Sequence, residues 1–134
     1  YFEPYPNVIA PITRTQNQDL GAESIAMSAY DSMNYNEAIT AFDDLLLHSS
    51  LKNEIRFYKA VALMSMGDHK KAKVQLELMN ENGAFKNQRK WYLALATLQL
   101  EEFDVTEILL NEIVRDQSSY SVFASEMLAE FFSN

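Results

Sequence analysis

The sequence predicts an all-α protein, built from three helical hairpins and a C-terminal closing helix. All three prolines lie within the first eleven of the 134 residues, so no proline interrupts a helix after that point. The remainder is rich in Ala, Leu, Glu, Lys and Met, which favour helix. It also resembles itself with a period of 34 residues, a length typical of stacked helical pairs.

The first 18 residues are expected to form an extended arm rather than a helix. The stretch "YFEPYPNVIAP" contains Pro4, Pro6 and Pro11, and each proline removes a backbone N–H and restricts the residue before it. Their spacing favours an extended or polyproline-like path. Because the chain opens at Tyr1 without an initiator Met, we expect a mature product or an excised segment, with any upstream signal missing.

Residues 19–134 are expected to form a helical repeat domain. Its repeats are predicted at about 19–52, 53–86 and 87–119. Seven helices are predicted near residues 19–32, 36–48, 53–66, 69–81, 87–100, 103–116 and 120–132. Gly67 and Gly83 fall where the apolar pattern pauses, as turn or C-cap glycines do. The last helix, "YSVFASEMLAEFF", is expected to cover the apolar end that stacked repeats leave.

Five columns of matched residues define the 34-residue period, each column taking one position from the three successive repeats. The columns are Ala26/Ala60/Ala94, Tyr35/His69/Phe103, Ala38/Ala72/Thr106, Phe42/Leu76/Leu110 and Leu45/Met79/Ile113. Small residues at a helix crossing allow two helices to approach closely. The first and third columns are therefore expected to face each other within a hairpin, and the two bulky columns to fill the space between neighbouring repeats.

The segments "YNEAITAF", "GDHKKAKVQL" and "KWYLALATLQLEEF" at this period resemble the tetratricopeptide repeat over about residues 19–116. The family pattern places an aromatic residue in the turn between the helices, Ala early in the second helix and a large apolar residue four positions later. The resemblance implies a right-handed α–α superhelix in which the first helix of each pair lines the concave side. Met33 and Glu101 stand where the family prefers Gly, Thr106 replaces the second-helix Ala, and the proline that usually closes each repeat is absent.

A narrower resemblance concerns the start of the chain. "YFEPYPN", followed by Arg14, the three repeats and "WYLALATLQL", resembles the outer domain of bacterial membrane-anchored tetratricopeptide proteins. This resemblance implies an anchor upstream of Tyr1 and a location on the periplasmic side of a bacterial membrane. Without such an anchor, a soluble cytoplasmic location is the alternative.

Composition argues against nucleic-acid, metal, cofactor and catalytic sites. The 19 acidic and 11 basic residues give a net charge of −8, which repels a phosphate backbone. With no cysteine and only His48 and His69, the chain offers few metal ligands or nucleophile–base pairs. No apolar run reaches the roughly 18 residues of a membrane-spanning helix. We therefore expect no enzyme, no cofactor, no nucleic-acid partner and no membrane insertion by this segment.

The remaining candidate site is an apolar stripe on the first helix of each repeat. Positions i, i+4 and i+7 share one helical face, which the resemblance places on the concave side. The apolar residues of this stripe are Met27, Tyr30, Phe57, Val61, Met64, Trp91, Leu95 and Leu98. One interpretation is a groove for an amphipathic helix or extended peptide of a partner, anchored on Phe57 and Trp91. The other is that the chain's own tail (120–132) or arm fills the groove, since a soluble monomer rarely exposes such a patch.

The predicted function is therefore a non-catalytic protein–protein interaction scaffold whose partner is a protein or a peptide. The alternative is a structural or self-association domain of a membrane-anchored envelope protein, with the groove filled by its own arm or tail. A homo-oligomer stays open under either hypothesis.

Overall fold

Helices account for most of the chain. The computed structural model describes residues 1–7 and 20–132, and within them lie seven α-helices and no strand. The helices are α2 (Leu20–Asp31), α3 (Tyr35–Leu46), α4 (Lys52–Ser65), α5 (His69–Leu78), α6 (Lys86–Gln99), α7 (Phe103–Asp116) and α8 (Ser121–Phe131). The all-α prediction is confirmed. The predicted first helical residue, 19, and residues 8–18 of the predicted arm lie outside the described residues.

The observed helix ends follow the predicted ones closely. The largest difference is at α5, which was expected to reach residue 81 and ends at Leu78. Met79 has an extended backbone (φ −72°, ψ 152°), and the N–H of Asn80 donates to Oδ1 of Asn53 at 3.0 Å. This hydrogen bond ties the end of α5 to the start of α4, so the backbone turns away instead of adding another helical turn.

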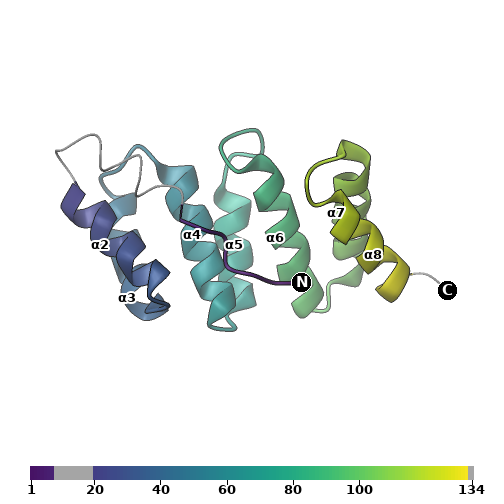
Figure 1. Ribbon diagram of the computed structural model, residues 1–134, viewed down its shortest axis with the longest axis horizontal. Helices are drawn as coiled ribbons and strands as arrows, with labels where there is room; N and C mark the ends of the chain where they lie inside the picture. Colours follow the sequence, from purple (N-terminus) through teal and green to yellow (C-terminus); the bar gives the residue numbers. More distant parts are fainter. Residues whose placement is uncertain (8–19, 133–134) are drawn as a thin grey trace.

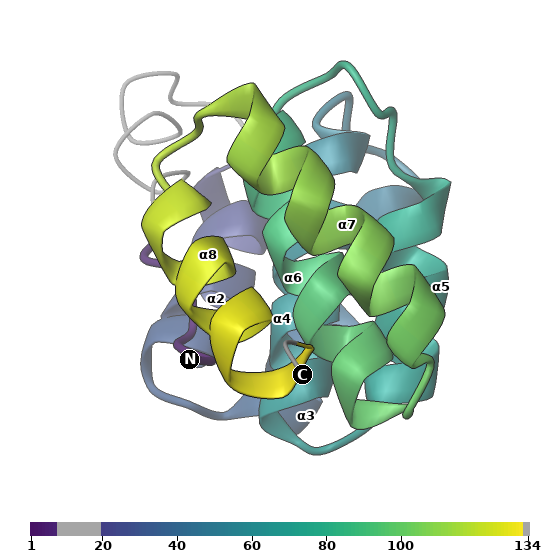
Figure 2. The ribbon, with the colours of Figure 1, turned by 90° about the vertical axis from the view of Figure 1, so that its right-hand side faces the viewer.

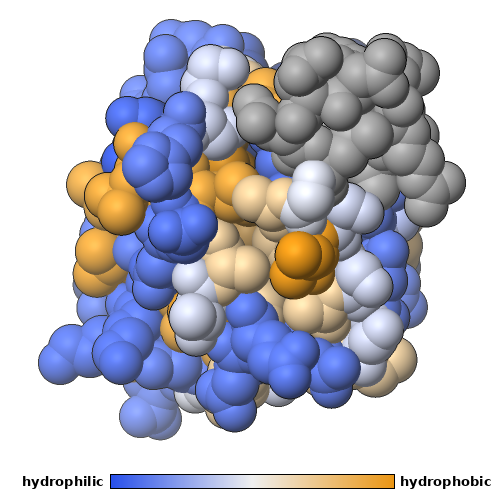
Figure 3. Space-filling model, turned by 90° about the vertical axis from the view of Figure 1, so that its left-hand side faces the viewer, coloured by the Kyte–Doolittle hydropathy of each residue, from blue (hydrophilic) through white to orange (hydrophobic). Residues whose placement is uncertain are grey.

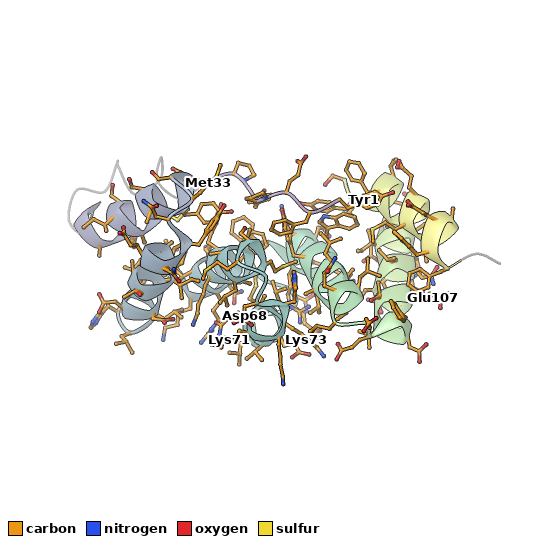
Figure 4. All side chains as sticks on the ribbon, turned by 90° about the horizontal axis from the view of Figure 1, so that it is seen from below. Tyr1, Met33, Asp68, Lys71, Lys73 and Glu107 are labelled. Atoms are coloured by element: carbon orange, nitrogen blue, oxygen red, sulfur yellow. The ribbon has the colours of Figure 1, made fainter. Side chains whose placement is uncertain are left out.

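The helices form two layers. Each helix packs against the next one in sequence, and α4 also contacts α6. Figure 1 shows α2, α4, α6 and α8 along the front of the row, with α3, α5 and α7 behind them. Figure 4 shows the two sides of the row, with Tyr1 and Met33 on one side and Lys71 and Lys73 on the other. The chain therefore advances as a row of helical hairpins, and α8 closes the row against α7 (Figure 2).

The 34-residue step recurs in the backbone of the turns within the hairpins. Met33, Gly67 and Glu101 have positive φ angles of 64°, 85° and 61°. After each of them, an N–H donates to the carbonyl five residues earlier: Asn34 to Ala29 (2.8 Å), Asp68 to Leu63 (2.8 Å) and Glu102 to Thr97 (2.9 Å). This pattern is the Schellman motif, a helix C-terminus that requires one residue in the left-handed conformation. Glycine adopts that conformation freely, whereas Met33 and Glu101 adopt it at a cost.

The residues of the two small and two bulky columns are all buried. No surface is exposed at Ala26, Ala60, Ala94, Ala38, Ala72, Thr106, Phe42, Leu76 or Leu110, and Leu45, Met79 and Ile113 are nearly as buried. Where Thr106 replaces Ala, its Oγ1 lies 2.8 Å from Oγ1 of Thr97 on the partner helix. The additional hydroxyl in the core is therefore hydrogen-bonded, as a buried polar group must be.

The two ends of the row differ. At the far end, α8 packs on α7 and buries Ala124 and Met127. At the near end, Figure 3 shows apolar surface over α2 and α3. Among the described residues there, Ile25 is 66% exposed and Leu47 is 76% exposed. The closing helix thus covers one end of the stack.

Candidate functional site

An extended segment, residues 1–7, crosses the face formed by α2, α4 and α6 (Figure 1). We call it the strap, and the face beneath it the strap-covered face. At one end, the side-chain amide of Asn7 donates to Oδ2 of Asp31 in α2 at 3.0 Å. At the other end, the hydroxyl of Tyr1 donates to Oε2 of Glu130 in α8 at 3.1 Å. The strap therefore connects the first described helix of the row to the last one.

The centre of the strap is held by an aromatic pocket around Tyr5. The Tyr5 ring lies 5.3 Å from the ring of Phe57, 6.2 Å from that of Tyr58 and 5.5 Å from that of Phe85 (centroid distances). The side-chain amide of Gln88 donates to the Tyr5 hydroxyl at 3.1 Å. Aromatic pairs of this kind contribute about 0.5–1.5 kcal/mol beyond the area that they bury. The pocket thus recognises both the ring and the hydroxyl of one tyrosine.

Three tyrosine hydroxyls, one from each helix of the face, hold the main chain of the strap. We call them the donor tyrosines: Tyr30 of α2, Tyr58 of α4 and Tyr92 of α6. Tyr30 donates to the Tyr5 carbonyl at 2.6 Å, Tyr58 to the Pro6 carbonyl at 2.7 Å, and Tyr92 to the Glu3 carbonyl. All three residues are buried, and a buried hydroxyl without a partner is costly. Because carbonyls are common to all residues, these bonds place the backbone without selecting side chains.

Burial raises the pKa of two of the donor tyrosines, Tyr30 and Tyr92. Loss of water around the ring raises the pKa of Tyr30 far above its ordinary value of 10, and the neighbouring Tyr58 adds to the effect. The pKa of Tyr92 is raised for the same main reason, with a further contribution from Tyr120. Only the neutral phenol can donate a hydrogen bond. The hydroxyls of Tyr30 and Tyr92 therefore stay donors to a higher pH than a free tyrosine would.

The first residue of the strap packs against an aromatic cluster centred on Trp91. Trp91 is 3% exposed and stacks on Tyr120, with ring centroids 5.3 Å apart and an interplanar angle of 12°. Tyr1 meets it edge-on at 6.4 Å, and Phe123 of α8 lies 6.0 Å away. A cavity of about 310 Å³ lies beside this cluster, between the strap, α6 and the start of α8. Space for a ligand group thus exists next to the strap.

The eight predicted site residues are all covered. Met27, Tyr30, Phe57, Val61, Met64, Trp91 and Leu95 are each at most 5% exposed, and Leu98 is partly buried. Both the strap and α8 contribute to the cover. A second cavity of about 350 Å³ is lined by Met64, Leu95 and Leu98 together with Phe2 of the strap and Phe131 of α8. A partner-binding role for the eight residues stays a prediction, and in this structure a partner would have to displace the strap.

Sequence reasoning singled out Tyr30 and Phe57, which hold Tyr5 and its carbonyl, but it missed Tyr58, Tyr92 and Phe85. Tyr58 and Tyr92 directly follow the stripe residues Phe57 and Trp91, and they stand 34 residues apart. A tyrosine at the same position of two successive repeats was the available signal. Phe85 lies before α6 with a φ of 62°, outside any helical periodicity, so no pattern in the sequence could place it in the pocket.

Charged side chains pair between helices, and the two carboxylates that bond the strap, those of Asp31 and Glu130, lie at its ends. Lys59 pairs with Asp43 at 2.5 Å, and Lys73 pairs with Glu102 at 2.7 Å. Across the part of the chain that the structure describes, no three His, Cys, Asp or Glu side chains come together as metal ligands. What the face offers is a set of aromatic rings and neutral hydrogen-bond donors, which suits an extended peptide chain.

Two further observations bear on the setting of this site. Within residues 20–132, no helix combines the length and the apolar character needed to cross a membrane. Comparison of the chain with protein-family models, with curated proteins and with solved structures gave no match.

Proposed function

We propose that this chain is a non-catalytic protein-interaction module of the tetratricopeptide type, and that its strap-covered face binds an extended peptide. The seating of the strap carries the proposal. Tyr5 lies among three aromatic rings, and the donor tyrosines bond the main chain on both sides of it. A face that holds residues 1–7 in this way has the groups to hold another segment of the same kind.

A right-handed α–α superhelix is part of this proposal. The 34-residue recurrence of left-handed turn residues supports it, as do the buried small columns at the helix crossings. In such a stack the first helix of each pair lines the inner side. The strap lies over α2, α4 and α6, the first helices of the three pairs, so it would occupy the inner surface.

The strap acts in this proposal as a tethered occupant. A segment joined to its own site competes at an effective concentration on the order of millimolar. An incoming peptide must bind tightly enough to displace the tethered strap, so weak and unspecific ligands are excluded. The face itself is preformed, because buried residues of three helices build it, and a preformed site loses little entropy on binding.

A structural role is the second candidate, and the burial of most of the face favours it. With the strap in place, seven of the eight predicted binding residues are at most 5% exposed. In this role the strap joins α2 to α8 permanently, and no partner displaces it.

The two candidates are separated by weakening the strap in the full chain. Tyr5→Ala removes the ring contacts with Phe57, Tyr58 and Phe85, and we expect it to release the strap while the helices stay folded. Trp91 is the only tryptophan and packs against Tyr1. Its emission should therefore shift to longer wavelength, with an unchanged far-UV circular dichroism spectrum. Glu3→Ala is the matched control, because that side chain is exposed and only its carbonyl is bonded.

Binding is then measured by fluorescence anisotropy with a diverse panel of labelled heptapeptides. An interaction module predicts at least one peptide that binds the Tyr5→Ala chain about tenfold more tightly than wild type, since the strap no longer competes. If no peptide binds either chain at up to about 1 mM while Trp91 reports a released strap, the interaction proposal is rejected in favour of the structural role.

A periplasmic location is proposed on the resemblance of the segment "YFEPYPN" to the start of the outer domain of bacterial membrane-anchored tetratricopeptide proteins. Protease added to cells with a permeabilised outer membrane should then degrade the domain while cytoplasmic proteins survive. Degradation only after lysis of the inner membrane would favour the cytoplasm.

A further inference from the structure

We infer that the ligand of the strap-covered face is a segment of a partner protein with a tyrosine between two prolines and with basic flanking residues. This inference rests on the proposed function and specifies its ligand class. It comes from the polarity of the site, from the two prolines of the strap and from the charge around it.

The centre of the site offers hydrogen-bond donors, and its two ends offer acceptors. In the centre, the donor tyrosines and the amide of Gln88 all donate to the strap. At the ends, the carboxylates of Asp31 and Glu130 accept from the strap. A matching ligand therefore presents carbonyl oxygens in its middle and donors at its ends.

Prolines on both sides of the tyrosine limit the conformations of the segment. Pro4 and Pro6 flank Tyr5, and a proline has a carbonyl but no N–H. Within this unit the carbonyls of Tyr5 and Pro6 accept from donor tyrosines, and the third accepting carbonyl is that of Glu3. Both prolines are exposed, so their contribution lies in the conformation of the peptide and not in a buried N–H. Proline restricts the free peptide, so less entropy is lost on binding.

The Tyr5 pocket supplies side-chain selectivity. Its rings accept any aromatic residue of suitable size, but the Gln88 amide donates to the Tyr5 hydroxyl. Phenylalanine would keep the ring contacts and leave that amide without this acceptor. Tyrosine is therefore preferred over phenylalanine, and both over small residues.

Charge and tethering point to a foreign partner rather than a second copy of the chain. Each copy carries a net charge of −8, so two copies repel each other at low ionic strength. A second copy also brings the same strap sequence, with no advantage over the strap already tethered in place.

The charge around the strap indicates basic residues in the ligand. Glu3 adds a negative charge to the strap, whose two ends bond the carboxylates of Glu130 and Asp31. A ligand with basic residues near these positions would gain the attraction that the strap lacks.

The test uses the full chain with Tyr5→Ala and a labelled peptide of residues 1–7. Replacing both prolines of the peptide (Pro4→Ala with Pro6→Ala) is expected to weaken binding about three- to tenfold, because the free peptide then loses more entropy on binding. Tyr5→Ala in the peptide should weaken it at least about tenfold, and Tyr5→Phe by about threefold. Glu3→Lys in the peptide should tighten binding about threefold at low salt, with the gain lost at high salt.

The chain itself provides a matched pair of variants. Tyr92→Phe, added to the Tyr5→Ala chain, keeps the ring and removes the donor to the carbonyl of residue 3, so the peptide should bind about three- to tenfold more weakly. Tyr35→Phe is the control, because Tyr35 packs on Tyr30 and makes no hydrogen bond to the described part of the arm. Thermal midpoints of both chains verify that they fold.

Each outcome bears on one claim. If the peptide without prolines binds within about twofold of the parent, the proline requirement is wrong while the interaction module stands. Weaker binding by the Glu3→Lys peptide at low salt would overturn the basic flanks. A concentration-dependent dimer of the wild-type chain, lost in Tyr5→Ala, would identify a second copy as the occupant and overturn the foreign partner. If no peptide of any composition binds, it is the proposed function that fails.

Discussion

The strap-covered face and the opposite layer of α3, α5 and α7 share one 34-residue step but treat polar groups differently. On the strap-covered face the polar groups are neutral hydroxyls, buried and bonded to main-chain carbonyls. On the opposite layer they are charged and partly exposed, as in the pair of Lys73 and Glu102, and Val74 is 48% exposed beside them. A neutral hydroxyl costs far less to bury than an ion. The buried centre of the strap-covered face therefore uses neutral hydroxyls, and the carboxylates of Asp31 and Glu130 that bond the strap lie at its two ends.

The largest effect is expected when a charge is introduced at a fully buried helix crossing. Ala60 on α4 has no exposed surface, so Ala60→Asp should lower the free energy of unfolding by at least about 3 kcal/mol. Val74→Asp on α5 is the matched control and should change it by less than about 0.5 kcal/mol. Urea unfolding followed by circular dichroism measures both. An Ala60→Asp chain as stable as wild type would contradict the 34-residue alignment.

Alkaline pH should act on the strap-covered face through its tyrosines. The pKa values of Tyr30 and Tyr92 are raised in the folded chain, mainly by burial. Their contribution to stability is therefore complete below the unfolded value of about 10 and is lost as the pH rises toward the folded values. Above pH 10 the free energy of unfolding should fall by up to about 1.4 kcal/mol per pH unit for each tyrosine.

Unfolding at a series of pH values, together with the ultraviolet absorbance of tyrosinate, measures this dependence. The double variant Tyr30→Phe/Tyr92→Phe is expected to reduce it, and Tyr120, whose pKa burial raises to about 12, should retain a smaller part. Ionisation of all seven tyrosines near pH 10 in a chain that stays folded would show that these hydroxyls are not buried.

A smaller effect tests the turns that connect the two layers. Met33→Gly and Glu101→Gly relieve a left-handed backbone at a non-glycine residue, and each should raise the free energy of unfolding by about 0.5–1 kcal/mol. Gly67→Ala is the reverse control. No atom lies within 4 Å of the added methyl group, so its expected loss of about 1 kcal/mol comes from the backbone alone. Thermal midpoints rank the three variants, and a neutral Gly67→Ala would remove the basis of the prediction.

The smallest effect belongs to the opposite layer. Glu102→Gln removes one charge of the pair with Lys73, and an exposed pair contributes little, so the loss should stay below about 0.5 kcal/mol. It should also vanish at high salt. A larger loss that does not depend on salt would show that this pair is shielded from water. The contrast between charged, exposed pairs on this layer and neutral, buried hydroxyls on the strap-covered face would then be weaker.

The fold was largely predictable from the sequence because its signals are local. Helix-favouring composition and a repeated apolar pattern placed seven helices, and the small and bulky columns are buried as expected. The early end of α5 was missed, because it depends on a hydrogen bond from Asn80 to Asn53, 27 residues away. The left-handed turns at Met33 and Glu101 carry no glycine, so only their alignment with Gly67 pointed to them.

The candidate site was predictable only in part. The i, i+4, i+7 rule found apolar residues of the three first helices, including Phe57 and Trp91, which touch the strap. It did not find the hydroxyls of Tyr58 and Tyr92, because helical periodicity describes apolar faces and not hydrogen-bond donors. The arm was one of two segments expected to fill the groove. Its path could not be deduced, because its contacts join residues as far apart as Tyr1 and Glu130.

That contact between Tyr1 and Glu130 also sets an order of events during synthesis. The two residues are 129 positions apart, and ribosomes add about 5–20 residues per second, so roughly 6–26 seconds separate their translation. The strap therefore leaves the ribosome before the last helix that it touches has been made. Its aromatic residues are then open to chaperones and to any other binding site. A fully seated strap therefore marks a chain whose described helices have all been made.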